Sequence, residues 1–193
     1  HQSLPLAEIL RQMNIYSNNK MAQILADLAG GVTEIARSAA TKANFPLTEI
    51  QLINGSGLGE ENRISPRAVC KMLMALDRLL EGSAFSVVDL FPTAGRDIVG
   101  TVQDRGLPSG TTVKTGTIDK LSALACVIPT SERGKDSFVI INNGRQVKYF
   151  RQQQDQLLNE LVQTLQLIPY QVDFAQNNDW YLGDPQRNLI QEQ

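Results

Sequence analysis

The stretch T-T-V-K-T-G-T-I-D-K-L-S-A-L-A-C-V-I, residues 111–128, decides the fold class of this chain. Thr111 to Ile118 and Leu121 to Ile128 each have the composition of a strand, because β-branched residues and short apolar runs favour pleated structure. Asp119-Lys120 leaves two residues between these runs, which is the length of a tight hairpin link. The stretch therefore predicts two antiparallel neighbours in a sheet.

The residues around this hairpin complete a mixed fold. Phe138 to Asn142 is a third extended run, after a polar link from Thr130 to Asp136. A helical pattern follows from about Val147 to Gln166, with Phe150, Leu157, Leu161 and Leu165 on one face. Helices are also predicted earlier, starting at Ser3-Leu4-Pro5, Ser17-Asn18-Asn19, Thr33 and Ser65-Pro66. This order predicts an α+β fold: helices and a small antiparallel sheet of about three strands, with the last helix covering one face.

Composition sets the broad class of protein. The 193 residues are 42% hydrophobic and 20% charged, which is ordinary for one globular domain. The net charge is −2 and there is no basic block, so a nucleic-acid partner is not expected. No apolar run approaches the roughly 18 residues that a bilayer-spanning helix needs.

Cysteine and histidine usage argues against a metal centre. The single His is the first residue and there is no C-x-x-C motif, so a zinc site is not expected. Cys70 and Cys126 lie in apolar surroundings far apart in the sequence. Buried free thiols are the favoured interpretation, and one disulfide between them stays open.

Lys114-Thr115-Gly116 is the first candidate for chemistry. An edge strand can take up an extended peptide as an added strand, and a glycine there permits close approach. The lysine offers a cation to a carboxylate and the threonine a hydroxyl. As a bare tripeptide it is better explained as an ordinary strand with a surface lysine and threonine.

Ser17-Asn18-Asn19 is the second candidate. A serine hydroxyl at a helix start can relay a proton, and an asparagine two residues later can hold an amide. Serine and asparagine are also the preferred N-cap residues, so the motif alone favours a structural role.

Together the two motifs resemble part of a known set. Penicillin-binding proteins and serine β-lactamases combine S-x-x-K, S-x-N-type and K-T-G elements around one site. The runs I-N-G-S-G-L (53–58), N-R-I-S-P (62–66) and K-T-G-T-I-D-K-L-S-A (114–123) make the resemblance specific. Over about residues 1–166 the chain resembles the D-alanyl-D-alanine carboxypeptidases of the low-molecular-mass class C penicillin-binding proteins. Asn54 departs from the aspartate usual in that family.

The nucleophile of that family, the serine of S-x-x-K, has two interpretations here. Ser17-Asn18-Asn19-Lys20 is the single S-x-x-K match, and it overlaps the S-x-N motif. Ser17 and Lys20 could be a self-contained nucleophile and base one helical turn apart. The resemblance favours the other interpretation, a C-terminal half whose S-x-x-K lies on a missing N-terminal segment. Residues 1–167 would then be the C-terminal part of a transpeptidase-like catalytic domain, with a tail, 168–193, packing on the body.

The resemblance implies a role for each site residue. Ser17 would relay a proton, Asn19 would hold the substrate amide, and Lys114 and Thr115 would hold the terminal carboxylate. Gly116 would let the peptide lie against the strand, and the Thr117 N–H would be an oxyanion donor. The expected reaction is cleavage of a D-alanyl-D-alanine stem peptide of peptidoglycan through an acyl-enzyme, with no metal or organic cofactor.

The same resemblance implies partners and a location. β-Lactams, the missing N-terminal half and self-association through an exposed sheet edge are expected, in the periplasm or cell envelope. One alternative is a non-catalytic module that binds peptides or proteins. Another is an unrelated α+β interaction domain, which would be excluded if Ser17, Asn19 and Lys114 lined one cleft.

Overall fold

The computed structural model describes residues 4–130 and 134–166. Its helices are α1 (Leu6–Tyr16), α2 (Asn19–Leu28), α3 (Gly31–Ala43), α4 (Pro66–Leu80) and α5 (Val147–Thr164). Its strands are β1 (Ile50–Gln51), β2 (Arg63–Ile64), β3 (Thr112–Ile118), β4 (Leu121–Thr130) and β5 (Gly134–Asn143). Short 3₁₀ turns are η1 (Leu47–Glu49), η2 (Val87–Leu90) and η3 (Gly100–Val102). The α+β prediction is confirmed.

The main sheet is an antiparallel meander in the order β3-β4-β5. Its first link has the two predicted residues, since Ile118 pairs with Leu121. The predicted polar link up to Asp136 is wrong, because β5 already begins at Gly134 and Asp136 pairs with Ile128. Backbone hydrogen bonds hold the ladder whatever the side chains are, so polar residues extend β5 toward its N-terminal end, ahead of the apolar pattern that starts at Phe138.

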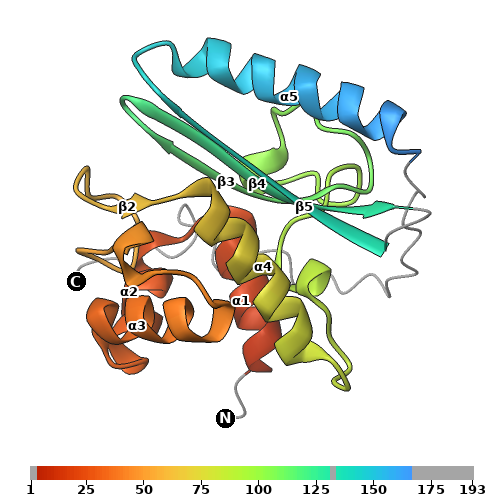
Figure 1. Cartoon of the computed structure of the whole chain (residues 1–193). Helices are drawn as coiled ribbons and strands as arrows, with labels where there is room; N and C mark the ends of the chain where they lie inside the picture. The colour runs from red at the N-terminus through yellow and green to blue at the C-terminus, as the bar shows by residue number, and fades with distance from the viewer. Residues whose placement is uncertain (1–3, 131–133, 167–193) are drawn as a thin grey trace, which may run out of the picture.

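Helices cover both faces of this sheet (Figure 1). Leu124, Cys126 and Ile128 of β4 pack with Leu158 of α5. On the opposite face, Val127 packs with Leu73 of α4 and with η2. A third apolar cluster joins α3 to α4 and includes Phe45 and Ala68. Burial of these apolar side chains is the main driving force for the layered arrangement.

The buried face of α5 differs from the predicted one. Leu157 is 42% exposed, whereas Gln154 and Leu158 are almost completely buried. At 100° per residue, Leu158 lies on the same stripe as Gln154 and Leu165, and Leu157 lies at its margin. Because Gln154 is polar, the hydrophobic pattern of the sequence does not identify it as the centre of the buried stripe.

The outer edges of the sheet differ in how they are covered. At the start of β3, the Val113 N–H donates to Pro92 O and the Ala94 N–H to Thr111 O. The rest of β3 has no neighbouring strand in the described part of the chain, and neither does the outer edge of β5. The sheet therefore offers two open edges on opposite sides of β4.

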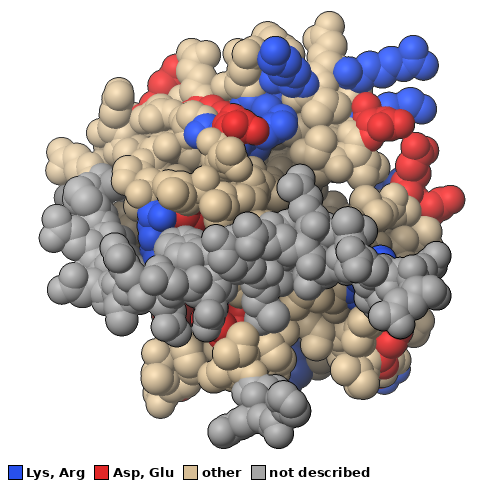
Figure 2. All heavy atoms as spheres, turned by 180° about the vertical axis from the view of Figure 1, so that it is seen from behind, with Lys and Arg blue, Asp and Glu red and all other residues tan. Residues whose placement is uncertain are grey.

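Charged side chains of both signs share the surface of the described part of the chain. Basic and acidic side chains lie side by side over the described part of the face in Figure 2. None of the helices described is both long and apolar enough to cross a membrane. Cys70 and Cys126 are free thiols, as favoured, but only Cys126 is buried, whereas Cys70 is half-buried. The tail predicted for 168–193 lies outside the described residues.

Candidate active site

Lys114 and Ser17 meet although they come from distant parts of the chain. The Lys114 Nζ donates to Ser17 Oγ over 2.8 Å, across a separation of 97 residues. It also donates to the carbonyl oxygen of Thr115 over 2.7 Å. Lys114 stands on β3, and Ser17 lies at the junction between α1 and α2. The sheet edge and this helix junction thus share one polar contact.

The backbone at the junction gives Ser17 an unusual conformation. Ser17 ends α1 with φ 52° and ψ 48°, a left-handed geometry that is uncommon for residues other than glycine. Asn18, rather than Ser17, is the N-cap of α2, since its Oδ1 accepts from the Met21 N–H over 3.0 Å. Ser17 therefore precedes the helix that contains Lys20. The interpretation of Ser17 and Lys20 as partners on one helical face is wrong.

The predicted site residues surround one cleft of about 1240 Å³. All six residues line it, namely Ser17, Asn19, Lys114, Thr115, Gly116 and Thr117. Because Ser17, Asn19 and Lys114 lie together, the hypothesis of an unrelated interaction domain is excluded on the condition set above.

Burial changes the acid–base character of Lys114. Loss of hydration disfavours its charged form and lowers the pKa of the amino group to about 8. An amine with that pKa is close to the range in which it can exchange protons at neutral pH. The other charged residues lining the cleft are Glu60, Arg63, Asp104, Lys120 and Arg151.

The open edge of β3 presents backbone groups to the cleft. The Val113 N–H points away from β4, since it donates to Pro92 O. On an antiparallel strand, alternate residues direct their N–H and C=O groups to the same side. The amides of Thr115 and Thr117 therefore also point outward. Thr117 is thereby placed as a backbone donor on the cleft side of the strand.

Thr115 and Gly116 differ in what surrounds them. Thr115 is 7% exposed and pairs with Leu124, which packs beneath α5. A Cβ added at Gly116 would lie 3.5 Å from Ala123 Cβ, an ordinary contact. The fold itself therefore does not require glycine at position 116.

Asn54 organises the loop that forms another wall of the cleft. Its Oδ1 accepts from the Gly57 N–H over 2.9 Å, and from Ser56 Oγ and Asn62 Nδ2 over 3.2 Å each. The amide oxygen thus serves as the acceptor at the centre of the turn, although it carries no charge. Ser56 and Asn62 line the cleft themselves.

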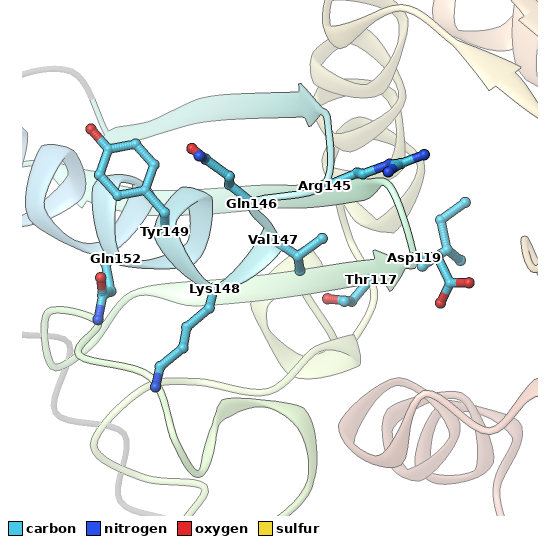
Figure 3. Close-up of a pocket in the computed structure, with 9 residues that line it drawn as sticks. Thr117, Asp119, Arg145, Gln146, Val147, Lys148, Tyr149 and Gln152 are labelled. Carbon is cyan, nitrogen blue, oxygen red and sulfur yellow. The ribbon is translucent and has the colours of Figure 1, made fainter.

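Some cleft residues were missed by the sequence analysis. Gly100, Thr101 and Asp104 line the cleft from η3 and the loop that follows it. Their segment carries no motif, and only the tertiary fold brings it beside Ser17. A second hollow of about 950 Å³ adjoins the end of β3 and shares Thr117 and Ile118 with the cleft. Figure 3 shows Lys148 and Arg145 beside it, with side chains that point in different directions.

Metal ligands do not gather anywhere in the described residues. No group of three or more His, Cys, Asp or Glu side chains there is arranged to hold a metal ion. The predicted site residues present hydroxyl, amide, amine and backbone N–H groups to the cleft.

Three comparisons with known proteins bear on this cleft. The model of the D-Ala-D-Ala carboxypeptidase 3 (S13) family matches residues 1–164. The chain is 27% identical over 160 residues to carboxypeptidase DacB of Mycolicibacterium smegmatis, covering 74% of this chain and 34% of that protein. A predatory endopeptidase of Bdellovibrio bacteriovorus, solved with an immunity protein, superposes with a TM-score of 0.78 at 26% identity. That match covers 89% of this chain and 46% of the endopeptidase.

A second solved structure adds a chemical observation. It is a penicillin G-acylated predatory endopeptidase of B. bacteriovorus, with a TM-score of 0.72 and 26% identity. The match covers 90% of this chain and 49% of that one. The chain thus spans about a third of the curated relative and less than half of each solved structure.

Proposed function

The chain belongs to the D-Ala-D-Ala carboxypeptidase 3 (S13) family, and from this membership we propose that it supplies part of a serine-type D-Ala-D-Ala carboxypeptidase site for peptidoglycan stem peptides. The observation that carries the proposal is the hydrogen bond between Lys114 Nζ and Ser17 Oγ at 2.8 Å. It joins the S-x-N and K-T-G motifs in one cleft. Endopeptidase activity on crosslinked peptides belongs to the same proposal, since two of the similar proteins are endopeptidases.

Ser17 acts as a proton relay in this proposal. Because Lys114 donates to the Ser17 oxygen, the serine keeps its own O–H free to donate elsewhere. An attacking serine adds to the carbonyl carbon of the penultimate D-alanine and gives its proton to the lysine of its S-x-x-K motif, while the bond to the terminal D-alanine nitrogen breaks. Ser17 gives its hydroxyl proton to this leaving nitrogen and takes the proton from that lysine in exchange, and water later releases the acyl group.

The remaining residues hold the substrate along β3. Lys114 and Thr115 flank the strand edge and bind the terminal carboxylate, and Asn19 binds the peptide amide. The outward N–H of Thr117 donates to the oxyanion of the tetrahedral intermediate. Gly116 leaves room for the peptide backbone against the strand.

The nucleophile is proposed to come from an S-x-x-K motif in the part of the enzyme that this chain does not span. Residues 1–167 are then the C-terminal part of the catalytic domain, followed by the tail 168–193. The open β5 edge supports association with the remaining half, or with a second copy of the chain. β-Lactams are proposed as covalent inhibitors, and the cell envelope or periplasm as the location, because that is where peptidoglycan lies.

Labelled penicillin tests this proposal. We would incubate it with the chain and with a longer product that includes the upstream coding region, and measure intact mass and the labelled peptide. The longer product should be acylated at a serine outside this chain, and Ser17→Ala should slow that acylation by about 10²-fold or more. An adduct on Ser17 would overturn the relay role. A longer product that binds stem peptide but is never acylated would favour the non-catalytic binding module.

A further inference from the structure

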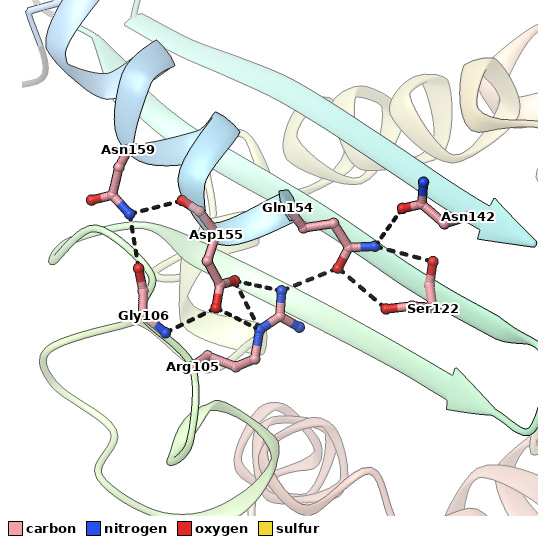
Figure 4. Close-up of polar contacts among 7 residues, drawn as sticks. All are labelled: Arg105, Gly106, Ser122, Asn142, Gln154, Asp155 and Asn159. Carbon is pink, nitrogen blue, oxygen red and sulfur yellow. Dashed lines mark hydrogen bonds and ion pairs between the residues drawn. The ribbon is translucent and has the colours of Figure 1, made fainter. Parts of the chain in front are cut away.

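A buried ion pair ties the loop after η3 to α5. Arg105 Nε and Nη2 donate to Asp155 Oδ1 over 2.8 and 2.6 Å, and the Gly106 N–H donates to Asp155 Oδ2 over 2.9 Å. Asn159 Nδ2 donates to Gly106 O over 2.8 Å. Figure 4 shows these groups meeting between the loop and one face of the helix. The Arg105 and Asp155 side chains are 1% and 16% exposed, so the pair is shielded from water.

Gln154 extends the same network into the sheet. Its Oε1 accepts from Arg105 Nη2 over 3.1 Å. Its Nε2 donates to Ser122 O on β4 over 3.1 Å and to Asn142 Oδ1 on β5 over 2.9 Å. The loop at Arg105 is therefore fixed to α5, to the central strand β4 and to the edge strand β5.

The turn η3, which leads into this loop, touches the residues just before Ser17. Thr101 Oγ1 donates to the carbonyl oxygen of Ile15 over 3.4 Å. Gly100 has φ +72°, and a Cβ built on it would lie 2.2 Å from the same oxygen. Only glycine permits so close an approach of η3 to the end of α1. Ser17 follows Ile15 by two residues and has a left-handed backbone that needs support from its surroundings.

We propose that Arg105 and Asp155 are positioning residues that hold η3 against α1 and thereby fix Ser17 opposite Lys114. Neither side chain lines the cleft, whereas Gly100, Thr101 and Asp104 of the same segment do. The pair acts through η3 rather than on a substrate. Its importance for catalysis rests on the proposed relay role of Ser17, but the contact itself is testable without any activity.

Asp155→Asn is the test, with Glu160→Gln as the matched control. Both remove one negative charge from α5, but the Glu160 carboxylate contacts the exposed Gln156 side chain instead of Arg105. Hydrogen exchange should become about tenfold faster in residues 13–20 as well as in 100–106 for Asp155→Asn, and stay unchanged in the control. Exchange in β4 should not change.

The pKa of Lys114, followed by NMR of labelled lysine, is the second readout. If η3 withdraws, water reaches the amino group, and its pKa should rise by roughly one unit. Loss of the negative charge of Asp155 would by itself lower the pKa of Lys114, because it removes a charge that favours the protonated amine. A rise of that pKa therefore shows that water has reached the amino group. If η3 withdraws, the Asp104 carboxylate moves with it and can itself change the pKa of Lys114. The titration is therefore repeated with Asp104→Asn added to both proteins, which removes that contribution.

Thr101→Val keeps the inference falsifiable if Asp155→Asn does not fold. This near-isosteric change removes the hydroxyl donor to Ile15 and leaves the Arg105 pair intact, so it should accelerate exchange in 13–20 but not in 103–106. Faster exchange confined to 100–106 in Asp155→Asn, with residues 13–20 and the Lys114 pKa unmoved, would overturn the positioning role. Failure of penicillin acylation in the longer product would instead count against the proposed function alone.

Discussion

Lys114 Nζ lies 2.8 Å from Ser17 Oγ, and the lysine reaches that contact from a half-buried position on β3. The two residues belong to the sheet edge and to the α1–α2 junction, so their contact depends on the tertiary fold. Desolvation of the amino group costs free energy in the folded state, and its hydrogen bonds to Ser17 Oγ and Thr115 O offset part of that cost.

The first prediction concerns the stability of Lys114→Met as a function of pH. Folding lowers the pKa of Lys114 from 10.5 to about 8, so between these values the unfolded state binds more protons. The native chain should therefore be less stable than Lys114→Met at pH 7, by up to about 3 kcal/mol. This difference should shrink as pH rises from 8 to 10.5. Urea unfolding of both proteins from pH 6 to 10.5 measures it, and a difference independent of pH would contradict the prediction.

The second prediction compares two glycines: a side chain at Gly116 should impair peptide binding, whereas a side chain at Gly55 should impair packing and stability. Gly116→Ala should leave the melting temperature unchanged or slightly higher, because its Cβ meets only Ala123 at 3.5 Å. It should nevertheless weaken binding of a D-Ala-D-Ala-terminated peptide to the longer product about tenfold or more, since the methyl group occupies the peptide's side of β3.

Gly55→Ala is the contrasting variant for that prediction. Its Cβ would lie 2.3 Å from Ala26 Cβ, so the chain should lose about 1–3 kcal/mol of stability. Thermal unfolding and calorimetric peptide titration of both variants decide the matter. Equal peptide affinity in Gly116→Ala and the native protein would show that the peptide does not lie along this strand.

The third prediction concerns Asn54, which stands where the resembling family has aspartate. Three donors converge on its Oδ1, and a carboxylate would accept them more strongly. Asn54→Asp should therefore stabilise the chain by about 1 kcal/mol at pH 7. The gain should disappear as the pH falls through about 4, where the new carboxylate becomes protonated. Asn54→Ala, which leaves the donors without their acceptor, should destabilise at every pH of the same thermal-unfolding series.

The fourth prediction concerns the open edge of β5. The Val113 amide faces away from β4, and the directions of the backbone amides alternate along each antiparallel strand. With the register of the sheet, this alternation places the Val139 amide on the open side of β5 and the Ile140 amide toward β4. Self-association of the chain, measured by sedimentation at several concentrations, should therefore fall in Val139→Pro while the fold is kept. Ile140→Pro should instead remove a ladder bond and destabilise the sheet. Unchanged association in a folded Val139→Pro would exclude the β5 edge as the contact.

The sequence predicted what depends on local pattern and missed what depends on burial. Ser65 caps α4 as expected, with its Oγ accepting from the Ala68 N–H. The hairpin link at Asp119-Lys120 was also correct, since turn length is a local property. Gln154 and Arg105 could not be assigned to the interior, because polar side chains are buried only when distant partners satisfy them. The same holds for Arg11, which forms an ion pair with the buried Asp97 at 2.6 Å.

For the site, the motifs identified six of the residues that line the cleft, while their roles stay predictions. The conformation of Ser17 was not foreseeable, because serine at a helix boundary reads as an N-cap. The N-cap is Asn18. The left-handed conformation of Ser17 belongs to the tertiary structure, in which Ser17 lies beside η3 and Lys114, and no local pattern indicates it.

The positive φ of Ser17 makes stability and activity favour different residues at this position. An L-residue there costs about 1 kcal/mol relative to glycine, which adopts the same backbone freely. A variant library selected only for heat tolerance should therefore drift toward glycine at position 17. Given the proposed relay role of Ser17, selection for turnover of the longer product should return it to serine, because only the hydroxyl reaches Lys114. The residue found at this position in an evolved population thus records which of the two demands was the stronger.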